Sequence, residues 1–334
     1  MASSLLFISL IVQVINIIMY NSWKSKVFYN NCMNKKKLNS LRLPVIVAPM
    51  FLVSGPELVI ASSKAGLVGS FPGPNARTID DLENWMHVIT SRLDGELWAF
   101  NMIAHKTYDR FQDELDLIAK FQPPIVITAL GSPARVLETV HSYGGIVIAD
   151  VNTVEYAKKC VEYGADGLAL VSYGAGGHTG TLSPFVFTSH VREFFDGIIV
   201  LAGSISNGSH IRAAQCLGAD LCYMGTRFIA TKESIAVDEY KDMVTRSQST
   251  DLRLTNLFTG ANAYYLKDSI INNGLDPDNL ETNEKGFNIS GSQDKISAWK
   301  DIWSAGQGVG FSKEIQSLEE IAIALEEEWR IVKL

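Results

Sequence analysis

Short apolar runs alternate with amphipathic helical patterns along most of this 334-residue chain, beginning near residue 44. This alternation is typical of βαβ units, in which helices join parallel strands. Eight runs are predicted strands: Pro44–Met50, Leu67–Phe71, Leu97–Ile103, Ile125–Leu130, Ile146–Val151, Gly167–Val171, Ile198–Ala202 and Leu221–Met224. Helices are predicted between them, at Pro56–Ala65, Ile79–Arg92, Tyr108–Phe121, Pro133–Ser142, Val154–Tyr163, Pro184–Phe195 and Ser209–Leu217. Eight strands separated by helices predict an α/β fold, the (β/α)8 TIM barrel.

The position of the glycine-rich loops separates this fold from its alternative, a doubly wound open sheet. An open sheet that binds a dinucleotide carries Gly-x-Gly-x-x-Gly after its first strand. Here the first strand ends in Ala48-Pro49-Met50, and the glycine-rich loops follow the sixth, seventh and eighth strands. We therefore predict one barrel over residues 41–334.

Beyond residue 232 the regular alternation of strand and helix patterns ends. Helices are predicted around Val237–Arg246 and Ala261–Asn272, followed by a polar segment, Asn273–Asp294. A closing helix is predicted at Lys313–Trp329, with one acidic face. Residues from about 233 to 334 are therefore expected to form a helical cover over the barrel mouth and a closing helix.

An apolar extension, residues 1–40, precedes the barrel. Residues 5–20 are nearly uncharged, lysines follow them, and a polar linker extends from Asn30 to Ser40. The apolar segment is short for a membrane span of about 20 residues and lacks the basic start of a signal peptide. Two interpretations stay open. One is membrane association through residues 5–20 with the barrel on the cytoplasmic side, and the other is an extension outside the working protein.

Charge and cysteine content restrict the partners. Lys and Arg total 29 against 36 Asp and Glu, a net charge of −7, which argues against nucleic-acid binding. The four cysteines, Cys32, Cys160, Cys216 and Cys222, have no C-x-x-C or Cys/His ligand spacing, so no metal site is expected. Three of them lie in apolar runs, where a free thiol behaves as a small core residue, and this favours a reducing, cytoplasmic location. A homodimer is a further candidate assembly.

The loop after the sixth strand is the first candidate for chemistry. It reads Gly174-Ala175-Gly176-Gly177-His178-Thr179-Gly180. Its glycines allow positive φ and a close approach of a ligand to backbone N–H groups. An imidazole has an ordinary pKa near 6.5, so His178 is a candidate proton donor or acceptor. The alternative is a tight turn in which His178 only hydrogen-bonds a neighbouring carbonyl.

Two more glycine loops follow the seventh and eighth strands. They contain Gly203-Ser204 and Met224-Gly225-Thr226. In TIM barrels a phosphate is commonly bound after these two strands, where free N–H groups are available. Together the two loops predict a phosphorylated cofactor or substrate.

The first and third strands end in residues suited to a flat heterocycle. Pro49 removes one backbone donor, and the thioether of Met50 can pack against an aromatic ring. Asn101, in Phe100-Asn101-Met102, offers an amide among apolar residues. Core packing is the alternative for Met50 and Met102, and a satisfied core amide is the alternative for Asn101.

The combination of these motifs resembles the nitronate monooxygenase family, formerly called 2-nitropropane dioxygenases. The resemblance covers roughly residues 41–330. It rests on the Ala-Pro-Met strand end, the Phe-Asn strand end, the Ala-Gly-Gly-His-x-Gly loop, the Ala-Gly-x-Ile-x-x-Gly loop, the Met-Gly-Thr-x-Phe strand end and the late Ser-Ala-Gly-Gln.

The resemblance implies a TIM barrel that holds FMN noncovalently over its strand ends and oxidises alkyl nitronates, such as propionate 3-nitronate, with O2 to a carbonyl compound and nitrite. It implies that His178 is catalytic and that Asn101 bonds the flavin ring system. The other implied cofactor-binding residues are Ala48, Pro49 and Met50 along the flavin, Gly176 and Gly177 at its edge, and Gly203, Ser204, Met224, Gly225 and Thr226 toward the phosphate.

Two departures from the family pattern bear on this expectation. Ser204 replaces the second glycine of an Ala-Gly-Gly phosphate loop. Family members also often carry Gln and Glu ahead of Ala-Gly-Gly-His, and here those places hold Val171 or Ser172 and Gly174. Two alternative functions stay open. One is an NAD(P)H-dependent flavin reductase on the same scaffold, such as an enoyl-ACP or quinone reductase, and the other is a barrel that binds a phosphorylated metabolite without redox chemistry.

Overall fold

The computed structural model describes residues 32–283, 292–293 and 296–332, and its core is a barrel of eight parallel strands. These strands are β1 (Val45–Val47), β2 (Gly69–Pro72), β3 (Trp98–Ile103), β4 (Ile125–Ala129), β5 (Ile146–Val151), β6 (Gly167–Val171), β8 (Ile198–Ala202) and β9 (Leu221–Met224). Their order around the sheet is β1-β9-β8-β6-β5-β4-β3-β2. Two backbone bonds, Val47 N to Val68 O (2.9 Å) and Val68 N to Val45 O (3.0 Å), join β1 to the start of β2. The predicted TIM barrel is confirmed.

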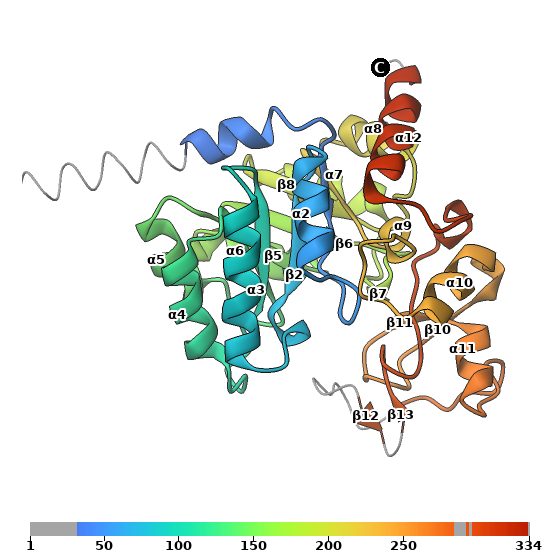
Figure 1. The fold of residues 1–334 in the computed structure, drawn as a ribbon. Helices are drawn as coiled ribbons and strands as arrows, with labels where there is room; N and C mark the ends of the chain where they lie inside the picture. Colours follow the sequence, from blue (N-terminus) through green and yellow to red (C-terminus); the bar gives the residue numbers. More distant parts are fainter. Residues whose placement is uncertain (1–31, 284–291, 294–295, 333–334) are drawn as a thin grey trace, which may run out of the picture.

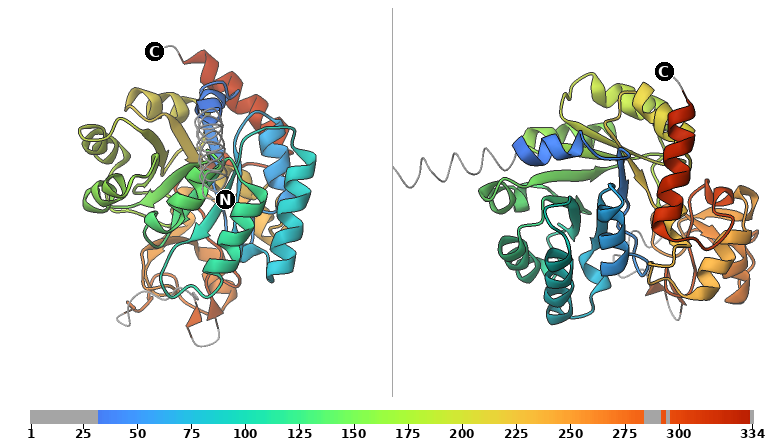
Figure 2. Two further views of the ribbon diagram at one scale, coloured as in Figure 1. Left: turned by 90° about the vertical axis from the view of Figure 1, so that its left-hand side faces the viewer. Right: turned by 45° about the horizontal axis from the view of Figure 1, so that its top comes forward.

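Helices surround this barrel in the predicted order (Figures 1 and 2). They are α2 (Pro56–Lys64), α3 (Ile79–Arg92), α4 (Phe111–Phe121), α5 (Ala134–Ser142), α6 (Val154–Tyr163), α7 (Pro184–Arg192) and α8 (Gly208–Cys216). Side chains fix several of their starts. Thr78 caps α3 in a capping box with Asp81, and Thr153 caps α6. These two helices have the predicted bounds.

The eighth helix of the barrel comes from much later in the chain. Helix α12 (Leu318–Ile331) packs between α8 and α2 (Figure 1). Ser317 caps it, accepting the Glu320 N–H at its side chain. Residues 225–317 are therefore inserted between the eighth strand and the eighth helix.

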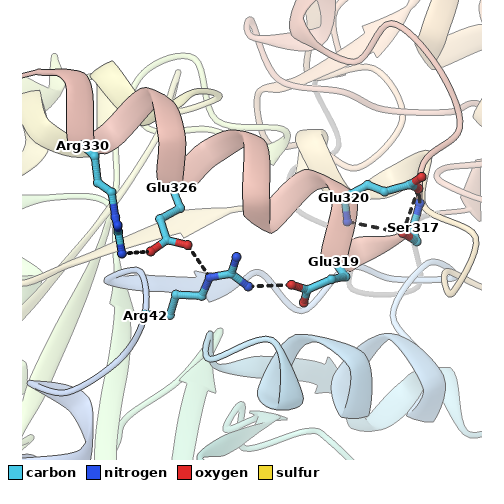
Figure 3. A network of polar contacts seen from close by, with 6 residues as sticks. All are labelled: Arg42, Ser317, Glu319, Glu320, Glu326 and Arg330. Atoms are coloured by element: carbon cyan, nitrogen blue, oxygen red, sulfur yellow. Dashed lines mark hydrogen bonds and ion pairs between the residues drawn. The ribbon is translucent and has the colours of Figure 1, made fainter.

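A charged network ties this late helix to the first strand (Figure 3). Arg42, just before β1, donates to Glu326 Oε2 at 2.6 Å and to Glu319 Oε1 at 2.7 Å. Arg330 also pairs with Glu326, one helical turn away. The network supports closure of the barrel at the junction of its first strand and eighth helix.

Strand side chains alternate between the barrel interior and the surrounding helices. One cluster fills the interior, with Ile46, Ala99, Ile127, Ile148, Ala169 and Val200 among its members. Two other clusters, which include Val47, Phe100 and Leu170, pack between strands and helices. Each strand residue can thus be assigned to the inside or outside of the barrel.

The inserted segment contains strands as well as helices. Its elements include α9 (Thr226–Ile229), α10 (Asp238–Arg246), β10 (Leu252–Thr255), β11 (Ala263–Leu266), α11 (Lys267–Asn272), β12 (Ser292–Gln293), β13 (Ile296–Ser297) and two short 3-10 helices, η2 (Ser249–Asp251) and η3 (Val309–Phe311). Strands β10, β11 and β7 (Gly177–His178) form a small antiparallel sheet. The predicted helix Ala261–Asn272 is therefore wrong in its first half, because β11 pairs on both sides there. The closing helix starts at Leu318 and not at the predicted Lys313.

Three expectations about the rest of the chain have different outcomes. Residues 5–20 lie outside the described residues, as does most of the predicted polar segment beyond residue 283. Residues 32–38, predicted as linker, are helical.

The cysteines differ in burial. Cys160 and Cys222 are buried, but Cys216 is exposed at the end of α8, so only two of the cysteines belong to the core. Within the described residues, no helix has the length and apolarity needed to span a bilayer.

Candidate active site

The loop after β6 is held against the inserted segment on both sides of His178. The Gly177 N–H donates to Ser304 Oγ at 2.9 Å, and the Thr179 N–H donates to Asn262 O at 2.9 Å. His178 itself pairs with Ala263 in the register of β7 and β11. Its backbone is therefore fixed by elements more than 80 residues away.

The imidazole of His178 lies in a partly buried niche. Its Nε2 is 3.0 Å from Thr259 Oγ1, and its ring meets the Trp299 ring edge to face at a centroid distance of 5.0 Å. Trp299 in turn contacts Phe51, which lies in the loop after β1. The imidazole therefore lies on the side of the inserted segment that faces the barrel mouth. Removal from water lowers the pKa of His178 to about 4. At neutral pH the side chain is a neutral imidazole.

The glycine loop packs on the late Ser-Ala-Gly-Gln segment. Gln307 N donates to Gly174 O at 3.1 Å, and Gly306 N donates to Thr226 Oγ1 at 2.8 Å. A Cβ on Gly176 would lie 2.8 Å from Gly306 N, which is too close for any side chain. The loops after β6 and β9 are thus brought together under residues 304–307.

The turns after β8 and β9 present free backbone donors. Gly203 and Ser204 have φ values of +118° and +57°, which direct consecutive N–H groups away from the strand ladder. The N–H groups of Gly203, Ser204, Gly225 and Thr226 donate no hydrogen bond to another residue of the described ranges. Four unsatisfied donors at two neighbouring strand ends have the chemistry of an anion cradle.

The Ala-Pro-Met strand end lies beside this cradle. Ala48 N donates to Met224 O, and a Cβ on Gly225 would lie 3.2 Å from Met50 Sδ and 3.5 Å from Ala48 Cβ. Ala48, Pro49 and Met50 are each partly exposed. They are placed where a flat ligand could lie across the mouth.

Buried Asn75 supports that strand end, and sequence reasoning missed it. Its Nδ2 donates to Met50 O at 2.9 Å and to Ser54 O at 2.7 Å, while its Oδ1 accepts from Leu52 N. Nothing in the local sequence, Pro74-Asn75-Ala76, indicates this role, because the partners lie more than 20 residues earlier.

Asn101 points into the barrel, like Ala99 two residues earlier on β3. Its Nδ2 donates to Ile127 O at 3.3 Å, and its Oδ1 accepts no bond from the described residues. Part of its amide is therefore available to a ligand.

The side chains of Met224 and Met102 point out of the barrel. Each packs in one of the two clusters between strands and helices. Only the backbone of Met224 lies near the mouth.

Two further polar residues at the mouth were not predicted. Asp150 and Tyr223 each have an oxygen that is buried and has no hydrogen-bond partner among the described residues, Oδ1 and the hydroxyl respectively. Tyr223 belongs to the interior cluster, and Asp150 follows Ile148 on the same side of β5. Desolvation raises the pKa of Asp150 to about 7. Asp150 could have been noticed as the single charged residue of the apolar strand Ile146–Val151.

A cavity of about 530 Å³ opens next to Ser204. Tyr264 and Gln307 also line it, and Gln307 Nε2 donates to the Tyr264 hydroxyl at 2.9 Å. The cavity provides space at the turn after β8, which belongs to the anion cradle.

A family model described as nitronate monooxygenase matches residues 74–327. The chain belongs to the nitronate monooxygenase family. This nitronate monooxygenase family member has a TIM-barrel fold. Its matched region includes His178, Asn101 and both turns of the anion cradle, whereas β1 precedes it.

Individual relatives of this family member differ in their described reactions. It is 28% identical over 205 residues to a (3aS,4S,5R,7aS)-5-hydroxy-7a-methyl-1-oxo-octahydro-1H-indene-4-carboxyl-CoA dehydrogenase from Rhodococcus jostii, covering 61% of this chain and 57% of that protein. The chain therefore spans under two thirds of that relative's length. It is 28% identical over 278 residues to a probable nitronate monooxygenase from Staphylococcus saprophyticus, covering 70% of this chain and 78% of that protein.

A solved structure has the same fold. Nitroalkane oxidase from Streptomyces ansochromogenes superposes with a TM-score of 0.73, covering 88% of this chain and 97% of the other, at 21% identity. At this identity the likeness shows the barrel architecture alone.

Proposed function

We propose that this protein is an FMN-dependent nitronate monooxygenase that oxidises alkyl nitronates, such as propionate 3-nitronate, with O2 to a carbonyl compound and nitrite. The observation that carries the proposal is the arrangement at the strand ends. One end of the barrel holds a neutral imidazole, that of His178. The same end holds four N–H groups, at the turns after β8 and β9, that bond no other residue of the described ranges.

The residues present fit FMN. The N–H groups of Gly203, Ser204, Gly225 and Thr226, which have no partner in the described part of the chain, match the needs of a phosphate, which accepts several hydrogen bonds. Within the ranges that the structure describes, an oxygen of Asp150 and one of Tyr223 lack partners, which supports a polar ligand inside the mouth, since buried polar atoms are seldom left unsatisfied. Ala48, Pro49 and Met50 would contact the flavin, and Asn101 would hydrogen-bond its ring system.

The chain's own part in the reaction is binding and proton transfer. Bound FMN would supply the electron transfer from the nitronate and the activation of O2. His178, as a neutral imidazole, would remove the α-proton of a neutral nitroalkane, and the C–H electron pair would be delocalised onto the nitro oxygens. A protonated His178 paired with an anionic nitronate is the alternative role, and it is disfavoured because the pKa of His178 is about 4.

The first experiment is an absorbance spectrum of the purified protein, followed by anaerobic titration. Bleaching of a flavin band by propionate 3-nitronate supports the proposal. Rapid bleaching by NAD(P)H and not by the nitronate would instead indicate a flavin reductase, a function that the dehydrogenase relative also suggests. A colourless protein that takes up no FMN would point to a non-redox barrel.

The second experiment tests His178. We expect His178→Ala to retain FMN and to lose turnover of a neutral nitroalkane by about 100-fold or more, the usual contribution of a general base. An unchanged kcat/KM for the nitroalkane would remove His178 from this role.

A further inference from the structure

Asp150 and Tyr223 face the interior of the barrel from different strands. Asp150 Oδ1, near the carboxyl end of β5, and the hydroxyl of Tyr223, on β9, are both buried. Neither has a hydrogen-bond partner in the described part of the chain. Leaving two such oxygens unsatisfied destabilises a folded protein, so the pair is best explained by a ligand that bonds both.

The surroundings of Asp150 favour the neutral form of its carboxyl. On the neighbouring strands the inward side chains are apolar, Ala169 opposite it on β6 and Ile127 on β4. The titratable groups near it are Tyr223 and Tyr156, at the start of α6, whose pKa values are raised by burial and further by the charge of Asp150. Desolvation raises the pKa of Asp150 to about 7, and no cation of the described ranges opposes this effect. A protonated carboxyl is a hydrogen-bond donor.

A ligand can reach this carboxyl from the mouth. Asp150 keeps part of its surface exposed, and the surface of an inward-facing residue at the end of β5 opens on the mouth. Asn101 also points inward, and its Oδ1 accepts no bond from the described residues. The mouth therefore offers one acceptor, the Asn101 oxygen, and two donors, the Tyr223 hydroxyl and the protonated carboxyl of Asp150.

The polar edge of an isoalloxazine has the complementary pattern. Its single N–H donates a hydrogen bond, whereas its carbonyl oxygens and its other ring nitrogens accept. Asn101 Oδ1 suits the N–H, so the remaining protein groups need to be donors. A carboxylate would place an unpaired charge among acceptors in an apolar mouth, which is costly, whereas a carboxylic acid donates.

We propose that Asp150 binds the flavin as a neutral carboxylic acid, which donates a hydrogen bond to the acceptor edge of the ring together with the hydroxyl of Tyr223. This inference rests on the proposed function in taking a flavin as the ligand. A neutral donor at this place also adds no negative charge next to a ring that receives electrons during turnover.

The direct test is the affinity for FMN at two pH values. After reversible removal of the flavin, the protein is titrated with FMN at about pH 6 and about pH 8, and the flavin fluorescence gives the Kd. The phosphate of FMN itself titrates near about pH 6, so wild type is compared with Asp150→Asn at each pH. If the protonated acid is the form that binds, the ratio of the wild-type Kd to the Asp150→Asn Kd should rise about tenfold between these values, because the pKa of Asp150 is about 7.

The variants separate donation from charge. Asp150→Asn keeps a side-chain N–H donor, so its Kd should stay within about threefold of the wild-type value at about pH 6. Asp150→Leu has no donor and should bind FMN about tenfold more weakly at that pH, and Tyr223→Phe about fivefold more weakly. Asp94→Asn is the matched control: it lies in an exposed turn before β3, at the opposite end of the barrel, and should behave as wild type at both pH values.

Proton uptake gives a second readout. At about pH 8 the carboxyl of the flavin-free protein is mostly ionised, so FMN binding to wild type should take up close to one proton more than binding to Asp150→Asn, measured by calorimetry in buffers of different ionisation enthalpy. No difference in uptake contradicts the inference. A wild-type Kd that falls with rising pH relative to Asp150→Asn would mean that a carboxylate accepts the ring N–H, and it overturns the inference. Equal affinities of wild type and Asp150→Leu at about pH 6 overturn it too.

Failure of this inference is distinguishable from failure of the proposed function. If FMN binds with the expected dependence on Asp150 but propionate 3-nitronate is not oxidised, the proposed function fails and the inference stands. If the nitronate is oxidised while FMN affinity and proton uptake do not depend on Asp150, the inference alone is wrong. A protein that takes up no flavin contradicts both.

Discussion

The α-carbon of Gly174 faces the hydroxyl of Ser204 so closely that any side chain at residue 174 would collide with it. Gln307 completes this contact, because its Oε1 accepts from Ser204 Oγ at 3.2 Å and would lie 2.7 Å from a Cβ on Gly174. At both residues, 174 and 204, the sequence departs from the family pattern. The departures are therefore coupled: the missing side chain at 174 makes room for the added one at 204.

We predict that Gly174→Ala destabilises the protein by about 2 kcal/mol or more, from both the clash and its φ of +88°. Ser204→Gly removes the contact with the Ser204 hydroxyl but leaves the contact with Gln307 and the φ strain. The double variant should therefore be more stable than the sum of the single changes by about 1 kcal/mol, measured by urea unfolding as a double-mutant cycle. Additive effects would contradict the coupling.

The pH dependence of nitroalkane turnover should follow the lowered pKa of His178. The folded pKa of about 4 lies below the ordinary 6.5, so the base is unprotonated over a wider range. We expect kcat/KM to rise with pH through about 4 and then to stay level across neutrality. A rise centred near 6.5 would show that His178 is better solvated than its surroundings indicate.

Asp150 should make the flavin-free protein less stable as the pH rises. Its folded pKa of about 7 exceeds the ordinary 3.8, so between these values the folded state binds more protons than the unfolded state. Stability then falls with rising pH in that window. Asp150→Asn should flatten this dependence when urea midpoints are compared at about pH 5 and about pH 8. A slope unchanged by the substitution would assign it to other groups.

Arg42→Ala should weaken the closure of the barrel. Arg42 bonds Glu319 and Glu326 of α12, and its guanidinium is partly buried, at 27% exposure. We expect a loss of about 1 kcal/mol in unfolding free energy, shrinking at high salt. The Arg42 hydrogen bond also lowers the pKa of Glu326, so the difference should vanish as the pH falls and Glu326 is protonated. Lys232→Ala, which removes a single exposed ion pair to Glu320, is the control and should have little effect.

The barrel could be predicted because its signals are local. Each strand is an apolar run, and capping residues such as Thr78 and Thr153 mark where helices begin. Ala263–Leu266 could not be assigned in this way. Its apolar run fits either a helix or a strand, and only its pairing with β7 and β10 decides between them.

In the site, too, residues with a local sequence signal could be predicted, and residues that act through contacts distant in sequence could not. His178 and the glycine turns were recognisable because a polar imidazole among glycines directly after an apolar strand serves no packing purpose. Thr259 and Asn75 were not, since each acts on a residue distant in sequence through bonds that no local pattern encodes. Met224 belongs to a recognisable motif, but strand alternation turns its side chain away from the mouth, so any contact with a cofactor stays a prediction for its backbone alone.

The insertion of residues 225–317 between β9 and α12 bears on how the molecule is made. During synthesis, all eight strands can leave the ribosome while the groove between α2 and α8 is still bare. The apolar residues of that groove stay exposed to water until α12 arrives, and the loop to be closed then spans almost 300 residues, from Arg42 to Glu326. Late ring closure of this kind is entropically costly, so nascent chains stalled before α12 should be the species that chaperones bind and that aggregate.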